Sequence, residues 1–400
     1  MNFRGADFNT MFRFLLFLAG ALCLQAGLPG ITRAGPCGDG KQIQVTDGMG
    51  ASVTVHLPVE RIIVEYMDNA ELVRILGHED KVVAVAGYDY IFHDCRRQFP
   101  QFRRLPSMGH PWGLDYEQVL AARPDLLLTF ASQNREKQMN LPGVDILFLG
   151  IYHPDLTRPA ASSFVRGVRN LGTILNARER AEDFISWYLE ILNRISERTQ
   201  ALRPDQKPTV LISSYPVCNS AGSRYCAYTP QDTLSQASRL AGGRNLVDLL
   251  SYDKGVSIPL DPEWLMSQNP DIILLHAVDD IQASGYEAEN PRFLEQGVAG
   301  FASAPELAGV NAVKNGRIYV LDGHFRNDAS GGALAAAYLA VLFHPELFED
   351  LDPEALHRQF LEMQNLSYDL DRHGIFFFPP LKNRGGLAGI PNRYGKGAMP

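Results

Sequence analysis

The stretch Leu114-Asp115-Tyr116-Glu117-Gln118-Val119-Leu120-Ala121-Ala122-Arg123-Pro124-Asp125-Leu126-Leu127-Leu128 recurs later as Leu260-Asp261-Pro262-Glu263-Trp264-Leu265-Met266-Ser267-Gln268-Asn269-Pro270-Asp271-Ile272-Ile273-Leu274. The two stretches begin 146 residues apart and are identical at six positions. Solenoid repeats have periods of roughly 20 to 50 residues, whereas this separation is about the size of one domain. The pattern therefore predicts two similar lobes, each with the same helix-then-strand unit.

Each copy of the unit carries the signals for a short helix followed by a buried strand. Asp115 and Asp261 suit the N-cap position, where a carboxylate accepts hydrogen bonds from the free N–H groups of the first turn. The proline of each copy ends the helix, because the residue before a proline avoids helical geometry. The apolar run that follows is typical of a buried parallel strand. Glu117 and Glu263 then fall at the second helical position of their units.

Composition places the chain among ordinary globular proteins. Its 400 residues are 46% hydrophobic, enough to bury one or two sizeable cores. The net charge of −8 argues against a nucleic-acid partner, because such partners select basic surfaces. We expect a monomer.

Residues 1–34 have the pattern of a secretory signal. Two arginines precede an apolar run over 14–24, and small residues near Ala34 favour cleavage after it. The run is short for a membrane span. Cys23 raises the alternative of a lipid anchor, which the bulky Leu22 before it disfavours, and an uncleaved anchor stays open as well. The pattern predicts a periplasmic or other extracytoplasmic location.

Four cysteines follow the signal, namely Cys37, Cys95, Cys218 and Cys226. Four cysteines allow three pairings, and exported proteins occupy oxidising compartments. We favour Cys37–Cys95 and Cys218–Cys226, because each bridge then stays within one lobe. Metal ligation by these cysteines is the alternative, although no C-x-x-C spacing supports it.

Strand and helix signals alternate on both sides of one long helical segment. Asn176 suits an N-cap, and apolar residues recur at helical spacing over about 25 residues before Pro204. A single long helix would make a stiff connector, and the alternative is a surface helix of one large domain. The expected organisation is a signal peptide over 1–34, an N-terminal α/β lobe over 38–175, an interlobe helix over 176–203, a C-terminal α/β lobe over 208–380 and a disordered tail over 381–400.

Taken in order, these elements resemble the periplasmic substrate-binding proteins of ABC importers for iron–siderophore, haem and cobalamin-type ligands. The resemblance covers about residues 41–365. It is carried by the opening hairpin, the two units quoted above, the segment Ala241-Gly242-Gly243-Arg244-Asn245-Leu246 and the segment Ala312-Val313-Lys314-Asn315-Gly316-Arg317-Ile318-Tyr319. It implies an α/β fold with two Rossmann-like lobes, one long rigid helix between them and a ligand cleft between the lobes. It also implies that Glu117 and Glu263 contact arginines of the membrane permease.

Ligands of open α/β sheets bind beyond the carboxyl ends of the strands, and aromatic residues gather there in this sequence. The candidate ligand-binding residues are Tyr66, Tyr88, Trp112, Tyr152, Tyr215, Tyr225, His276 and Arg326. Aromatic rings offer large contact areas to a flat chelate, histidine or tyrosine can ligate a metal, and arginine pairs with ligand carboxylates. The metal ligands, if there are any, stay unassigned.

These observations predict a binding protein that captures a metal chelate, an iron–siderophore or corrinoid-like ligand, and delivers it to an ABC permease and its ATPase. No intrinsic cofactor is expected. One alternative is a haem receptor of the same class. Another is a receptor for bare zinc or manganese, with ligands from His110, His153, His276 and an acid. A periplasmic metalloenzyme is disfavoured, because no G-x-S-x-G, H-E-x-x-H or P-loop motif occurs.

Overall fold

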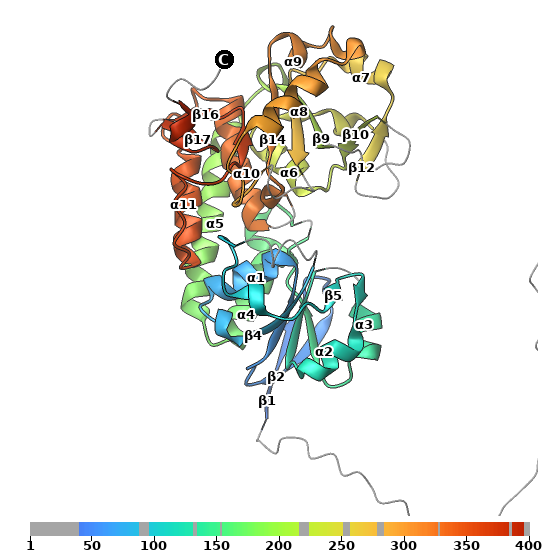
Figure 1. The fold of residues 1–400 in the computed structure, drawn as a ribbon, viewed down its shortest axis with the longest axis vertical. Helices are drawn as coiled ribbons and strands as arrows, with labels where there is room; N and C mark the ends of the chain where they lie inside the picture. The colour runs from blue at the N-terminus through green and yellow to red at the C-terminus, as the bar shows by residue number, and fades with distance from the viewer. Residues whose placement is uncertain are drawn as a thin grey trace, which may run out of the picture. The chain divides into compact units, whose positions relative to one another are not determined.

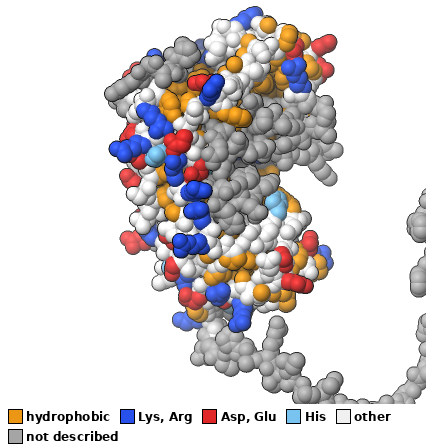
Figure 2. Space-filling view, viewed as in Figure 1, with side chains coloured by type: hydrophobic (Ala, Val, Ile, Leu, Met, Phe, Trp, Pro, Cys, Tyr) orange, Lys and Arg blue, Asp and Glu red, His pale blue; other side chains and the backbone are white. Residues whose placement is uncertain are grey.

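The computed structural model describes residues 40–87, 96–130, 134–152, 154–215, 224–250, 257–277, 284–326, 329–383 and 386–395. The predicted signal over 1–34 lies outside these residues. Among the described helices, none combines the length and the apolar character that crossing a membrane requires. On the face shown in Figure 2, acidic and basic side chains are intermixed.

The first half of the described chain contains a four-stranded parallel sheet in the order β4-β3-β7-β8 (Figure 1). Its strands are β3 (Ile62–Glu65), β4 (Val82–Ala86), β7 (Leu126–Thr129) and β8 (Asp145–Phe148). The predicted hairpin before it is confirmed as β1 (Lys41–Thr46) and β2 (Ser52–Leu57), and a small ladder joins β5 (Gly109–His110) to β6 (Gly113–Leu114). The helices are α1 (Tyr66–Ile75), α2 (Tyr116–Ala122), α3 (Asn134–Asn140) and α4 (Ser163–Ile174).

The second half contains a five-stranded sheet in the order β11-β9-β13-β14-β15, parallel except for its last strand. Its strands are β9 (Thr209–Tyr215), β11 (Arg244–Asn245), β13 (Ile272–Ala277), β14 (Ile318–Leu321) and β15 (Phe377–Phe378). A separate ladder pairs β10 (Tyr225–Tyr228) with β12 (Ser257–Leu260). The helices are α6 (Thr233–Leu240), α7 (Pro262–Gln268), α8 (Arg292–Ala302), α9 (Asn311–Lys314), α10 (Ala329–Phe343) and α11 (Pro353–Met363). The predicted α/β class with two parallel-stranded lobes is confirmed.

The duplicated unit is confirmed as α2 followed by β7 and α7 followed by β13. Asp115 caps α2 by accepting a hydrogen bond from Gln118 N at 3.0 Å, and Asp261 caps α7 by accepting from Glu263 N at 2.8 Å. Both helices end in the left-handed region, at Arg123 (φ 49°) and Asn269 (φ 48°). The same local signals have therefore produced the same local structure twice.

The long helix between the two sheets is α5 (Arg178–Thr199), which spans about 33 Å at the usual helical rise. The predicted cap at Asn176 is wrong. Asn176 has φ 56° and follows the C-terminus of α4, where asparagine suits the left-handed position, and Ala177 precedes α5 without a side-chain cap.

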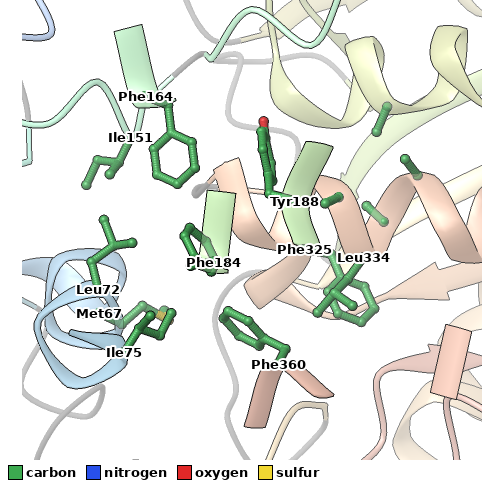
Figure 3. Close-up of a cluster of buried hydrophobic side chains, with 14 of the residues drawn as sticks. Met67, Leu72, Ile75, Ile151, Phe164, Phe184, Tyr188, Phe325, Leu334 and Phe360 are labelled. Atoms are coloured by element: carbon green, nitrogen blue, oxygen red, sulfur yellow. The ribbon is translucent and has the colours of Figure 1, made fainter. Parts of the chain in front are cut away.

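One hydrophobic core runs past α5 into both halves. Phe184 and Tyr188 of α5 lie against Phe164 of α4, with ring centroids 6.1 and 5.3 Å from it. Figure 3 shows these rings between side chains of α1 on one side and Phe325, Leu334 and Phe360 of the second half on the other. The connector therefore has one face buried along its length, which restrains bending.

Beside this core, polar contacts cross between the halves, and we call three of them the interlobe bonds. Arg74 of α1 donates to Gln364 Oε1 at 2.5 Å, Gln98 Oε1 lies 2.8 Å from His324 Nε2, and Arg97 N donates to Glu287 Oε1 at 2.5 Å. Arg74, Gln98 and Gln364 are all buried. Buried polar contacts of this kind hold because breaking one leaves a desolvated partner.

The prediction of a disordered tail over 381–400 is wrong for the residues that the structure describes there. Leu381–Asn383 (β16) and Gly386–Ala388 (β17) pair, and the carbonyl of Gly389 accepts hydrogen bonds from Phe376 N and Phe377 N at 2.7 and 3.0 Å. The polar composition misled the prediction, because the sparse apolar residues Leu381, Ala388 and Ile390 are the buried ones.

Candidate functional site

A cluster of aromatic side chains lies at the carboxyl edge of the first sheet, and we call it the aromatic wall: Tyr66, His110, Trp112, Phe130 and Tyr152. Phe130 follows β7 and is its centre, with its ring centroid 4.5 Å from Tyr66, 5.7 Å from Trp112 and 5.4 Å from Tyr152. His110 stacks on Trp112 at 4.7 Å. Trp112 is 49% exposed although it belongs to this cluster. A supported but exposed indole is suited to contact a ring or an apolar ligand surface.

Tyr66 begins α1 in an unusual backbone conformation. Its φ is 68°, and its side chain is buried against Phe130. A bulky residue in the left-handed region is strained by about 1–3 kcal/mol, and such strain gathers at functional sites. The conformation turns the chain directly from β3 into α1 at the sheet edge.

The second half contributes a buried arginine from the turn that follows β14. Arg326, just after the 3₁₀ turn Gly323–Phe325, donates to Asp232 Oδ2 at 2.7 Å and lies 4.0 Å over the Tyr228 ring. Burial alone would lower the pKa of Arg326, but the Asp232 carboxylate beside it raises that pKa above the usual range. Asp232 is itself fixed, because it caps α6 by accepting from Leu234 N at 3.0 Å. Because the Asp232 carboxylate balances the charge of the guanidinium, the ion pair carries no net charge.

His276 near the end of β13 contacts the arginine site through Tyr228. Its Nδ1 lies 2.8 Å from the Tyr228 hydroxyl and its Nε2 lies 3.4 Å from the Gly323 carbonyl. Burial, with the nearby charge of Arg326, lowers the pKa of His276 to about 3. The imidazole is therefore neutral and uses both nitrogens within the protein, which suits a supporting role better than metal ligation.

Tyr152 of the aromatic wall lies within electrostatic reach of the arginine site. Burial raises the pKa of the Tyr152 hydroxyl, while the positive charge of Arg326 opposes that rise, so the two side chains are electrostatic neighbours. Four residues after Tyr152, Leu156 N donates to Gln236 Oε1 of α6 at 2.9 Å. The structure thus brings together Tyr66, Trp112, Tyr152, His276 and Arg326 from the predicted set.

Tyr225 lies in a different cluster. Its hydroxyl donates to Glu306 at 2.8 Å and its ring packs on Phe301 of α8 at 5.8 Å, within the second core cluster. Burial first, then the hydrogen bond to Glu306, raises the pKa of Tyr225 to about 12. Tyr88 and the side chain of Tyr215 lie outside the described residues.

No group of three or more potential metal ligands occurs among the histidine, cysteine, aspartate and glutamate side chains that the structure describes. His153, one of the predicted ligands for a bare ion, lies outside that part of the chain, as do Cys37, Cys95 and Cys218. Cys226 is disulfide-bonded. The disulfide pairing and the metal ligands therefore stay predictions.

Glu117 on α2 and Glu263 on α7 are both exposed, each one position after the first residue of its helix. Neither side chain is needed for the N-cap, which the preceding aspartates supply. Both carboxylates are therefore available to a partner.

Phe130 and Asp232 belong to the site but not to the predicted set. Phe130 directly follows β7, and that position could have identified it. Asp232 directly precedes a helix, which is an N-cap signal, but its bond to Arg326 depends on a contact 94 residues away.

The chain matches a family model described as periplasmic binding protein over residues 62–324. Among solved structures it is similar to the TroA-like periplasmic binding protein FepB from Veillonella parvula, with 21% identity over 84% of this chain and 99% of that chain and a TM-score of 0.67. It is also similar to the molybdate periplasmic binding protein MolA from Haemophilus influenzae, with 14% identity, 82% and 99% coverage and a TM-score of 0.63. A third is the catecholate-siderophore binding protein VctP from Vibrio cholerae, with 17% identity, 76% and 100% coverage and a TM-score of 0.57. At these identities the likeness shows the fold. No curated protein sequence matches the chain.

Proposed function

Because the chain belongs to the periplasmic binding protein family, we propose that it is the extracytoplasmic component of an ABC importer that captures a metal chelate. In this proposal the protein binds its ligand without changing it and passes it to the permease. An N-terminal signal over 1–34 exports the chain. The family itself implies an extracytoplasmic protein that delivers a small molecule to a permease.

The observation that carries the proposal is the half-exposed Trp112 packed against the buried Phe130, in an aromatic wall within electrostatic reach of the Arg326–Asp232 pair. Ring faces suit the organic shell of a chelate, and a fixed arginine orients its polar edge. VctP, which is similar in fold, is described as binding a catecholate siderophore. MolA is described as bound to molybdate, but here the arginine is already neutralised by Asp232, which favours a ligand larger than a bare oxyanion.

The ligand is tested by purifying the exported protein and recording the absorbance spectrum and mass of whatever copurifies. Haem, a corrinoid and an iron–catecholate have distinct spectra. Haemin, a ferric tris-catecholate and Zn²⁺ alone are then titrated while the intrinsic tryptophan fluorescence of the protein is followed. Saturable, stoichiometric quenching by a chelate supports the proposal. Binding of Zn²⁺ alone would point to the bare-metal receptor, and turnover of any probe would point to an enzyme.

The delivery step is tested on the two exposed glutamates. Glu117→Ala combined with Glu263→Ala is expected to leave ligand affinity intact and to reduce uptake, because surface carboxylates orient a charged partner. Glu190→Ala with Glu197→Ala, two exposed positions on α5, is the matched control. Lost affinity with normal uptake would contradict the assignment of Glu117 and Glu263 to docking.

A further inference from the structure

A fully buried ion pair lies behind the aromatic wall. Glu65, the last residue of β3, and Lys137 of α3 are 0% and 1% exposed at their side chains, and Lys137 Nζ lies 2.6 Å from Glu65 Oε1. Lys137 also donates to Glu65 Oε2 at 2.7 Å and to Thr129 Oγ1 at 2.8 Å. The pair thus ties the carboxyl ends of β3 and β7 to α3, at the edge where ligands of such sheets bind.

The carboxylate of this pair holds the centre of the wall directly. Glu65 Oε2 accepts hydrogen bonds from Phe130 N at 2.8 Å and from Thr129 Oγ1 at 2.9 Å. These two hydrogen bonds therefore fix the backbone that carries the Phe130 ring. Phe130 in turn contacts Tyr66, Trp112 and Tyr152.

The backbone of Glu65 fixes a second ring of the wall. Glu65 is followed at once by Tyr66 in its left-handed conformation, and the Asn69 side chain donates to the Glu65 carbonyl at 2.8 Å and to the Leu128 carbonyl at 3.2 Å. A strained residue persists only where its surroundings over-determine it. The contacts around Glu65 provide that constraint for Tyr66.

Stability alone does not account for burying two charges here. Taking an ion pair out of water costs several kcal/mol per ion, and well-packed apolar residues of the same volume often serve stability equally well. An apolar pair, however, offers no acceptor to Phe130 N. The geometry therefore selects for the hydrogen bond that Glu65 makes, with Lys137 present to neutralise it.

We infer that Glu65 and Lys137 are positioning residues that hold the aromatic wall, through Phe130 and Tyr66, in the arrangement that receives the ligand. The inference rests on the proposed function, because the wall is taken as the ligand surface. In this inference Glu65 and Lys137 keep the aromatic wall ordered without touching the ligand themselves. A preorganised surface binds more tightly, because less side-chain freedom is lost on binding.

The test uses two charge-neutral double variants that differ in whether residue 65 offers a side-chain oxygen to Phe130 N and Thr129 Oγ1. Glu65→Gln with Lys137→Met keeps an oxygen at that place, whereas Glu65→Leu with Lys137→Met removes it. Both are made in a background with Trp187→Phe and Trp264→Phe, so that emission reports on Trp112 alone. The readouts are the Trp112 emission maximum, its acrylamide quenching constant, and titration with haemin and a ferric tris-catecholate.

The glutamine variant is expected to match the background protein. The leucine variant is expected to show stronger acrylamide quenching of Trp112 and about tenfold weaker binding of whichever chelate probe binds the background protein. Leu307→Ala, a buried change in the second core cluster, is the control for a general loss of stability and should not move Trp112 emission. If the leucine variant does not fold, Glu65→Asp retracts the carboxylate from Phe130 N and carries the same expectation.

Identical quenching in the two double variants, or an equal change in Leu307→Ala, would overturn the inference. Failure of every probe to bind the background protein would instead refute the proposed function. The quenching comparison needs no ligand, so the two failures are distinguishable.

Discussion

Replacing Glu354 with glutamine is expected to remove a pH dependence from the stability of the protein. Glu354 of α11 is 9% exposed, and its Oε2 accepts hydrogen bonds from Gly389 N at 3.2 Å and from the Tyr338 hydroxyl at 3.4 Å. Burial raises the pKa of this carboxyl from 4.5 to about 7, against the opposing effects of the Gly389 bond and the Arg358 charge.

The sign follows from which state holds the proton. Between pH 4.5 and about 7 the folded protein keeps a proton on Glu354 that the unfolded chain has released. Stability from this group is therefore fully present below pH 4.5 and is lost as the pH rises to about 7. A shift of this size corresponds to about 3 kcal/mol of unfolding free energy, at 1.36 kcal/mol for each pKa unit.

The assay is urea denaturation at pH 4.5 and pH 8 for the natural protein and Glu354→Gln. Because the amide does not titrate, the natural protein should lose about 3 kcal/mol more than the variant between these pH values. Glu349→Gln, at an exposed glutamate, is the control and should follow the natural protein. Parallel pH profiles for Glu354→Gln and the natural protein would refute the reasoning.

Two further changes test the local structure. Asp261→Ala should lower the unfolding free energy by about 1 kcal/mol, because two backbone N–H groups of α7 lose their acceptor, and urea denaturation measures it; no change would contradict the capping role. Gln364→Leu should cost about 1.5–3 kcal/mol, because the buried Arg74 guanidinium keeps the Gln98 carbonyl but loses the Gln364 oxygen as an acceptor. An unchanged urea midpoint at equal slope would show that this interlobe bond adds nothing.

The repeated helix-then-strand units could be predicted because their signals are local. A capping aspartate, a proline and an apolar run each act within a few residues, and Asp115 and Asp261 form the expected bonds. The edge on which Trp112 and Arg326 lie could also be predicted, since it follows from strand direction alone.

The partners of those side chains could not be predicted, because they depend on contacts far apart in sequence. Arg326 bonds to Asp232, 94 positions earlier, and Lys137 bonds to Glu65, 72 positions earlier. The C-terminal strands were missed for a related reason. Their few apolar residues become buried only because the Phe377–Phe378 strand lies beside them.

The interlobe bonds have a consequence for how a bound ligand would dissociate. A wide separation of the halves would break the bonds that Arg74 and Gln98 make to the second half, and would expose the core that both halves share, at a cost in free energy. We expect the rate at which the ligand dissociates to depend on its contacts with the aromatic wall and Arg326 rather than on separation of the two halves. In the proposed function, delivery therefore requires the permease to supply the free energy that separates the halves.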